Sequence, residues 1–299
     1  MLKVSEHLTS TKNPKIKNIQ LLQKHRERDE QGLFVLEGSL EIERAHQAGY
    51  EFATVFFVPE MINQSGVEKF VTGTNDVFSI SAALFEKLTY RGNTGGMLVL
   101  AKQKDHKLEN LQLKANPLIV VLEALEKPGN LGAILRTADA AAVDAVVVCD
   151  THTDIYNPNV IRSSIGCLFT VPVAVASSED VIHFLKSGNI NVFCTALTAS
   201  VSYHTIDFTQ SSAIVMGTEA TGLSEQWLEA SGQSIIIPMA GIADSLNVST
   251  SAAIVIFEAV RQRGFLNQSQ CFVGSSHPHS DARFARRAFG TSHQDTKEH

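Results

Sequence analysis

Three short segments in the second half of this 299-residue chain combine glycine with polar side chains. They read EKPGNLGAILRT at residues 126–137, GTEATG at 217–222 and IPMAGIADSLNVS at 237–249. Each segment follows or completes an apolar run that is typical of a buried strand; the runs are Leu118–Leu122, Ala213–Met216 and Ile235–Ile237. Loops at the carboxyl ends of parallel strands are common ligand sites in α/β sheets. We therefore expect an active site where these three loops meet.

The first segment offers an amide and a guanidinium at the start of a predicted helix, residues 130–142. Asn130 can cap that helix or present its amide to a ligand. Arg136 follows nearly two turns later, so we expect the two side chains on roughly one face. An arginine can hold a phosphate through two parallel hydrogen bonds. The alternative is a capped helix with a surface arginine. Gly129 and Gly132 resemble a broken dinucleotide loop, but G-x-G-x-x-G is absent, which disfavours a Rossmann site.

The other two segments offer a carboxylate and a helix N-terminus. Glu219 stands between glycines, where it can accept hydrogen bonds from a hydroxyl, an amine or an arginine, or simply build a turn. No Lys-Ser or Lys-Thr pair follows, which disfavours a Walker phosphate loop. Gly241 lets the backbone approach a ligand closely. Ser245 and Asn247 precede a helix predicted to begin near Val248, and a helix N-terminus favours negative charge nearby. Capping alone would explain one of these two residues.

The elements that position these segments alternate between strand and helix. This alternation over residues 115–266 predicts a parallel α/β sheet with helices on both faces. Residues 1–102 predict a smaller α/β domain, and the polar stretch 103–114 predicts the linker between the two. Residues 267–299 are rich in Ser, His, Gln, Asp and Arg, which predicts a flexible tail.

Composition narrows the class of protein. A hydrophobic content of 44% and a charged content of 19% are typical of a soluble globular protein. The chain has no apolar run near the roughly 20 residues of a membrane span, and its N-terminus has no signal-peptide core, so we expect a cytoplasmic protein without membrane contact. The four cysteines lack metal-type spacing and the histidines of the tail are irregularly spaced, so we expect buried thiols and no metal site.

Basic residues concentrate at the N-terminus, although the net charge of the whole chain is −6. Seven lysines and arginines lie within residues 1–28, most of them on a helix predicted over residues 13–28, with Asn13 as its cap and Pro14 in its first turn. This charge is either a solvated helix face or a basic arm that meets phosphates.

The three segments together resemble the SpoU (TrmH-type) RNA 2′-O-ribose methyltransferases of the SPOUT superfamily. The matching stretches are NLGAILR, MGTEATGLS and IPMAGIADSLNVSTSAAIVIFEAVRQR, in the order and with the spacing of that family. The stretch NPKIKNIQLLQKHRERDEQGLFVLEG is similar to the small substrate-binding domain that often precedes the catalytic domain.

This resemblance implies a C-terminal parallel-sheet SPOUT domain with a trefoil knot, preceded by a small α/β, ribosomal-protein-like RNA-binding domain. It also implies bound S-adenosylmethionine and a homodimer. The catalytic residues that it implies are Asn130, Arg136, Glu219, Ser245 and Asn247. The cofactor-binding residues are Leu197, Gly217, Ile237, Met239 and Leu246. We expect RNA phosphates at Lys12, Lys15, Lys17, Arg26, Arg28 and Arg91.

The implied reaction is methyl transfer from S-adenosylmethionine to a ribose 2′-hydroxyl of 23S-type ribosomal RNA. The same reaction on transfer RNA is the nearest alternative. An RNA-binding protein that has lost catalysis is an alternative of a different class, which the intact set of catalytic residues disfavours. A nicotinamide dehydrogenase is disfavoured further, because its glycine fingerprint is missing.

Overall fold

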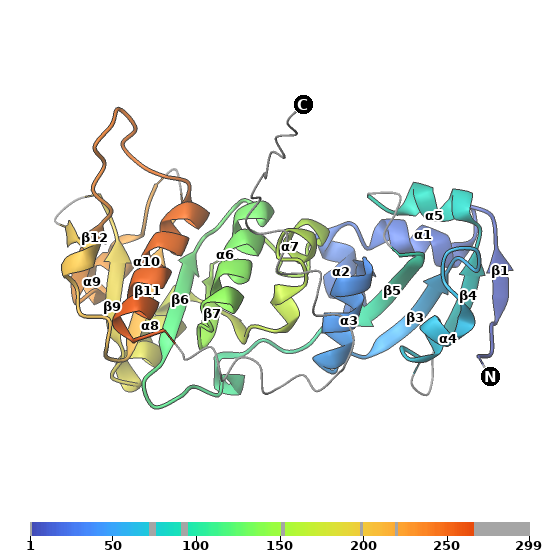
Figure 1. Ribbon diagram of the computed structural model, residues 1–299, viewed down its shortest axis with the longest axis horizontal. Coiled ribbons are helices and arrows are strands. Elements are labelled where there is room, and N and C mark those ends of the chain that lie inside the picture. Colours follow the sequence, from blue (N-terminus) through green and yellow to red (C-terminus); the bar gives the residue numbers. More distant parts are fainter. Residues whose placement is uncertain are drawn as a thin grey trace, which may run out of the picture. The chain divides into compact units, whose positions relative to one another are not determined.

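The computed structural model describes residues 2–71, 76–90, 95–150, 153–197, 200–218 and 221–265. Met1–Arg263 form one compact unit that contains two sheets, labelled in Figure 1. The predicted tail 267–299 and the candidate residues Arg91 and Glu219 lie outside the described residues. No helix in the described ranges is long and apolar enough to cross a membrane.

The first sheet has five strands in the order β1-β4-β3-β5-β2. They are β1 (Glu6–Leu8), β2 (Leu33–Glu37), β3 (Phe52–Phe57), β4 (Asp76–Ile80) and β5 (Met97–Lys102). Strand β5 is antiparallel to β2 and β3, whereas β1 and β3 are parallel to β4. The helices are α1 (Pro14–Leu21), α2 (His25–Gln31), α3 (Ser39–Gln47), α4 (Gln64–Glu68) and α5 (Ala82–Leu88).

Both faces of this sheet are buried. Successive side chains of a strand point to opposite faces, and here the side chains on both faces are apolar. Leu98 and Leu100 of β5 join the apolar cluster of α1 and α5, whereas Met97 and Val99 join the cluster that includes α3. The predicted α/β fold of this part of the chain is therefore confirmed. Strand β1 and helix α4 were not predicted.

The prediction of a single helix over residues 13–28 is wrong, because the chain forms two helices there, α1 and α2. Helix α1 ends at Leu21, and Lys24 has an extended backbone before α2 begins. The carbonyl groups of a last helical turn need outside partners. Here Nη1 of the buried Arg28 donates to the carbonyl oxygen of Leu22 at 2.8 Å. The break is thus stabilised by a side chain from the next helix.

The second sheet has seven strands, all parallel, in the order β10-β12-β9-β11-β6-β7-β8. They are β6 (Leu118–Glu123), β7 (Ala145–Cys149), β8 (Val173–Ala176), β9 (Asn191–Thr195), β10 (Val201–Ser202), β11 (Ser212–Met216) and β12 (Gln233–Ile236). The α-helices are α6 (Pro128–Ala140), α7 (Pro158–Ser163), α8 (Ser178–Ser187), α9 (Glu225–Ala230) and α10 (Val248–Gln262). Short 3-10 helices are η1 (Leu108–Asn110), η2 (Cys167–Phe169) and η3 (Tyr203–Thr205).

Helices cover both faces of the second sheet, as predicted (Figure 1). Helices α6 and α10 share one apolar cluster with alternate residues of β6, β7 and β11. Helices α8 and α9 share the other cluster, which contains the intervening residues of the same strands. Strand β10 and helix α9 were not predicted.

One continuous apolar cluster contains side chains from both sheets. Within it the rings of Phe34 and Tyr156 are stacked with their centroids 4.4 Å apart. The domain boundary at residues 103–114 stays a prediction, and so does the trefoil knot.

Candidate active site

A cavity of about 730 Å³ lies among the loops that follow β9, β11 and β12. Its size is within the range of pockets that hold small ligands and cofactors. All five residues predicted to bind a cofactor line it, from three separate loops: Leu197, Gly217, Ile237, Met239 and Leu246. Its lining contains both apolar side chains, such as Val255, and hydroxyl groups, such as that of Thr195. The structure therefore gathers these five candidates at one site.

The loop after β11 is closed on itself by its backbone. The N–H groups of Thr218 and Gly222 each donate to the carbonyl oxygen of the other, at 3.1 Å in both cases. A Cβ on Gly217 would overlap the carbonyl group of Gly222 and would lie 2.6 Å from the nitrogen of Leu223. Gly217 is therefore required by a close approach of two backbone segments beside the cavity.

Replacing Gly217 with alanine is expected to weaken S-adenosylmethionine binding at least tenfold, because the added methyl group must push the 218–222 loop away from its present place. Isothermal titration calorimetry measures this affinity. Gly232→Ala is the matched control, since a Cβ there meets only the Val192 carbonyl oxygen, at 3.8 Å. Unchanged affinity in Gly217→Ala would show that the loop does not shape the cofactor site.

The first and third sequence segments meet through two asparagines. Asn247 Nδ2 donates to Asn130 Oδ1 at 3.2 Å, which joins the N-terminal turns of α6 and α10. Asn247 is also the cap of α10, because its Oδ1 accepts from the Ser249 N–H at 3.0 Å. Asn247 therefore both caps α10 and lines the cavity. Asn130 is hydrogen-bonded to Asn247 and so lies beside the cavity.

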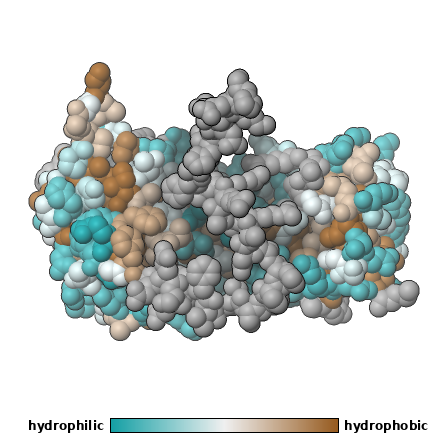
Figure 2. All heavy atoms as spheres, viewed as in Figure 1, coloured by the Kyte–Doolittle hydropathy of each residue, from teal (hydrophilic) through white to brown (hydrophobic). Residues whose placement is uncertain are grey.

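The loop between β12 and α10 carries Ser245 and an exposed apolar tip. Ser245 lines the cavity and donates through its hydroxyl to Asp244 Oδ1 at 3.1 Å. Two apolar side chains of this loop, Ile242 and Leu246, are exposed to solvent. Figure 2 shows brown spheres at the tip of this protruding loop. This tip is therefore accessible to an RNA or to a second subunit.

Arg136 is exposed on α6 and is not among the residues that line the cavity. Six positions along an α-helix turn the side chain by about 120° from Asn130, so the expectation that the two share a face is wrong. Within the described parts of the chain its guanidinium has no hydrogen bond or ion pair. It is therefore available to a ligand that approaches from outside the helix.

The prediction that Arg28 contacts RNA is wrong. Its side chain is 1% exposed, and its Nε lies 2.5 Å from Oδ2 of Asp154, whose side chain is 7% exposed. The other four described candidates, Lys12, Lys15, Lys17 and Arg26, are all exposed. Lys15 pairs with Asp76 at 2.7 Å on the surface, an arrangement that contributes little to stability and leaves the charge accessible.

Sequence analysis missed a buried carboxylate that supports the site. Glu123 ends β6 and is 5% exposed, and it accepts from the Ser224 N–H at 2.8 Å and from the Ser224 hydroxyl at 2.5 Å. These bonds fix the chain just after the 217–222 loop. The available signal was a single acid at the end of the apolar run Leu118–Leu122.

The described cysteines are buried and free, as predicted: Cys149, Cys167 and Cys194. Burial raises the pKa of Cys149 and raises that of Cys194 to about 11, so both thiols stay protonated and unreactive near neutral pH. Across the described residues, no group of three or more His, Cys, Asp and Glu side chains could hold a metal ion.

Comparison with known proteins agrees with this geometry. Residues 117–257 match the model of the SpoU rRNA methylase family, and residues 13–99 match the MRM3-like substrate binding domain. The fold, the cavity and these matches define the chain as an S-adenosylmethionine-dependent RNA methyltransferase with a separate substrate-binding region. More particularly, it belongs to the SpoU rRNA methylase family.

Three relatives cover most of this chain. The 23S rRNA (guanosine(2553)-2′-O)-methyltransferase RlmP of Bacillus subtilis is 29% identical, over 84% of this chain and 98% of its own. The crystal structure of an RNA 2′-O ribose methyltransferase is 40% identical with a TM-score of 0.74, and covers 86% of this chain and 99% of its own. The AdoMet-bound rRNA methyltransferase from Sinorhizobium meliloti is 31% identical with a TM-score of 0.79, covering 85% and 97%.

Proposed function

We propose that this protein transfers a methyl group from S-adenosylmethionine to a ribose 2′-hydroxyl of 23S-type ribosomal RNA. The observation that carries the proposal is the convergence of Leu197, Gly217, Ile237, Met239 and Leu246 on one cavity, with the Asn130–Asn247 pair at its edge. The names of the relatives support ribosomal RNA over transfer RNA as the substrate.

The residues present fit S-adenosylmethionine. The cavity combines an apolar wall for the adenine ring with hydroxyl and backbone groups for the ribose and the amino acid end. Because Gly217 has no side chain, two backbone segments can meet closely beside the cavity. When bound, the cofactor supplies a methyl group on a sulfonium, which is a strong electrophile with a neutral leaving group.

The protein then has two tasks, positioning and proton handling. The Arg136 guanidinium would hold the phosphate next to the target ribose and stabilise negative charge that develops on the 2′-oxygen. The amides of Asn130 and Asn247, the hydroxyl of Ser245 and the carboxylate of Glu219 would orient the ribose. Because an arginine is almost always protonated, we assign Arg136 an electrostatic role rather than that of the base.

Transfer of a labelled methyl group to separated pools of unmodified ribosomal and transfer RNA tests the proposal. Nucleoside analysis should recover the label as a 2′-O-methyl nucleoside from the ribosomal pool. Label in the transfer RNA pool would instead support the alternative substrate. Cofactor binding without transfer to either pool would favour a ribonucleoprotein substrate, and a chain that binds RNA but no cofactor would be a non-catalytic RNA-binding protein.

RNA affinity should depend on the exposed basic residues of the N-terminal region. Replacing Lys12, Lys17 and Arg26 together with glutamine is expected to weaken RNA binding, and to flatten the slope of log affinity against log salt by about one for each lost phosphate contact. Filter binding over a range of potassium chloride concentrations measures the slope. Lys186→Gln, an exposed lysine on α8, is the control. An unchanged slope in the triple variant would place the RNA surface elsewhere.

We also propose a cytoplasmic homodimer. The proposal rests on the resemblance to this family, in which RNA binds near the subunit boundary. Light scattering coupled to gel filtration measures the mass, and a mass of one chain at micromolar concentration would refute it.

A further inference from the structure

A second cavity, of about 260 Å³, lies where α1, β2 and the end of α5 meet α7. Its apolar floor includes Ile19, Val35 and Leu88. We call it the junction pocket and define it by its polar lining, which is Gln20, Gln23, Glu37, Lys87, Thr89, Tyr90 and Arg162. None of its lining residues also lines the cofactor cavity.

Tyr90 gives the junction pocket an accessible aromatic ring. This residue is 74% exposed, although large aromatic side chains are usually buried. The guanidinium carbon of Arg162 lies 4.0 Å from the centroid of the ring, and the Tyr90 N–H donates to Glu37 Oε2 at 3.0 Å. The ring is therefore held in place while most of it stays open to a ligand.

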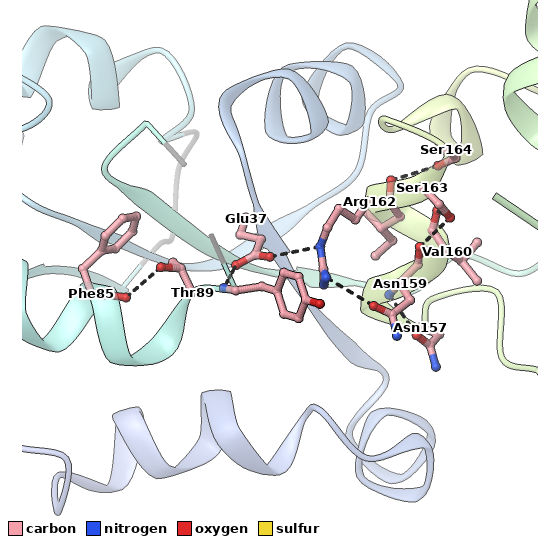
Figure 3. Close-up of polar contacts among 11 residues, drawn as sticks. Glu37, Phe85, Thr89, Asn157, Asn159, Val160, Arg162, Ser163 and Ser164 are labelled. Carbon is pink, nitrogen blue, oxygen red and sulfur yellow. Dashed lines mark hydrogen bonds and ion pairs between the residues drawn. The ribbon is translucent and has the colours of Figure 1, made fainter. Parts of the chain in front are cut away.

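Glu37 and Arg162 both line the pocket and point toward one another (Figure 3). Their side chains are only 16% and 17% exposed, and Arg162 Nε lies 3.4 Å from Glu37 Oε1. Arg162 Nη1 donates to Asn159 Oδ1 at 3.2 Å, which fixes the guanidinium, yet Nε is buried without a hydrogen bond in the described chain.

Three other polar side chains of the junction pocket can read the edge of a base: Gln20, Gln23 and Glu37. In the described part of the chain the side-chain amides of Gln20 and Gln23 have no hydrogen-bond partner, and each offers both a donor and an acceptor. A carboxylate such as that of Glu37 accepts from the amino groups of bases. An aromatic ring, an apolar floor and amide groups form the combination that proteins use to hold single unpaired RNA bases.

We propose that the junction pocket binds one unpaired base of the substrate RNA, at a nucleotide other than the one that is methylated. The proposal rests on the proposed function and adds a specificity subsite to it. The base would stack on Tyr90 and present its edge to Glu37 and the two glutamines. Because Arg162 comes from α7 and Tyr90 from the N-terminal region, one nucleotide would contact both parts of the chain.

Replacing Tyr90 with alanine tests the stack. We expect the dissociation constant for an unmodified 23S rRNA transcript and the KM for that RNA to rise about tenfold, the size of one lost base stack. Tyr90→Phe keeps the ring and should behave as the wild type. Leu40→Ala, an exposed apolar residue on α3, is the control for a truncated surface side chain. Thermal unfolding verifies that each variant is folded. Unchanged RNA affinity in folded Tyr90→Ala would overturn the proposal.

A set of transcripts that each lack one base identifies the nucleotide. One abasic position should weaken wild-type binding about tenfold but cause no further loss in Tyr90→Ala, because the stack is already absent there. Identical abasic profiles for the two proteins would overturn the proposal. Since binding is measured apart from methyl transfer, an inactive protein with the expected abasic pattern would refute only the proposed enzyme activity, not the pocket.

Discussion

Arg136→Ala should lower kcat for methyl transfer by about 100-fold or more, while the affinity for S-adenosylmethionine stays within a factor of two. The size follows from the loss of one charged group that stabilises a developing oxyanion. The selectivity follows from position, because Arg136 is exposed on α6 and does not line the cofactor cavity. Single-turnover transfer to unmodified ribosomal RNA gives the rate, and calorimetry gives the cofactor affinity.

Two further variants make this result specific. Arg136→Lys keeps the charge but not the planar fork, so a role in bidentate phosphate binding predicts that lysine restores only a small part of the rate. Arg261→Ala is the matched control, since Arg261 is exposed on α10 and bound to Glu258 of its own helix at 2.7 Å. Turnover at the wild-type rate in Arg136→Ala would refute the assignment.

The second large effect concerns stability. Arg28→Ala should lower the free energy of unfolding by about 3–5 kcal/mol, because it leaves a buried carboxylate without its counter-charge. Asp154 is 7% exposed and has Arg28 as its only ion-pair partner within the described chain. The same substitution removes the donor to the Leu22 carbonyl oxygen at the end of α1. Equilibrium unfolding in urea, followed by circular dichroism, measures the loss.

Arg26→Ala is the control for this experiment. Arg26 lies two residues away and pairs with Glu30 at 2.6 Å, but its side chain is 84% exposed. An exposed pair contributes at most about 1 kcal/mol, so this variant should unfold close to the wild type. Equal losses of unfolding free energy in Arg28→Ala and Arg26→Ala would mean that burial does not make the Arg28–Asp154 pair more stabilising than the Arg26–Glu30 pair. Salt should not change the effect of Arg28→Ala, because buried pairs are poorly screened.

Much of the fold could be predicted from apolar periodicity. The runs Leu118–Leu122 and Ala213–Met216 are apolar at every position, which indicates strands buried on both faces, and they form the neighbouring parallel strands β6 and β11. The helix predicted over residues 13–28 shows the limit of this approach. Its apolar residues Ile16, Ile19 and Leu22 have helical spacing, and residues 23–28 are all polar, so nothing in the pattern marks a break. In the structure, the turn before α2 is stabilised by Arg28, which donates to the Leu22 carbonyl oxygen. Local spacing carries no information about such a bond.

The short elements β1 and α9 were not predicted, because they too depend on contacts with distant parts of the chain. Strand β1 has only the three residues Glu6–Leu8, and it exists because its backbone pairs with β4, about 70 residues away in the chain. Helix α9 is six residues long and is held by packing of the buried Trp227. Elements of this length are decided by tertiary contacts rather than by intrinsic propensity.

For the candidate site, the sequence by itself determined the loops and the residue types that they carry. Strand-end loops with glycine at a close approach, and capping residues at the start of a helix, follow from local rules. Which of these residues meet was decided only by the tertiary structure, because hydrogen bonds and ion pairs act over a few ångströms regardless of separation along the chain. Asn130 meets Asn247, which is 117 residues away, and Arg28 meets Asp154, which is 126 residues away. The first contact joins two predicted site residues, and the second turns a predicted RNA ligand into part of the core.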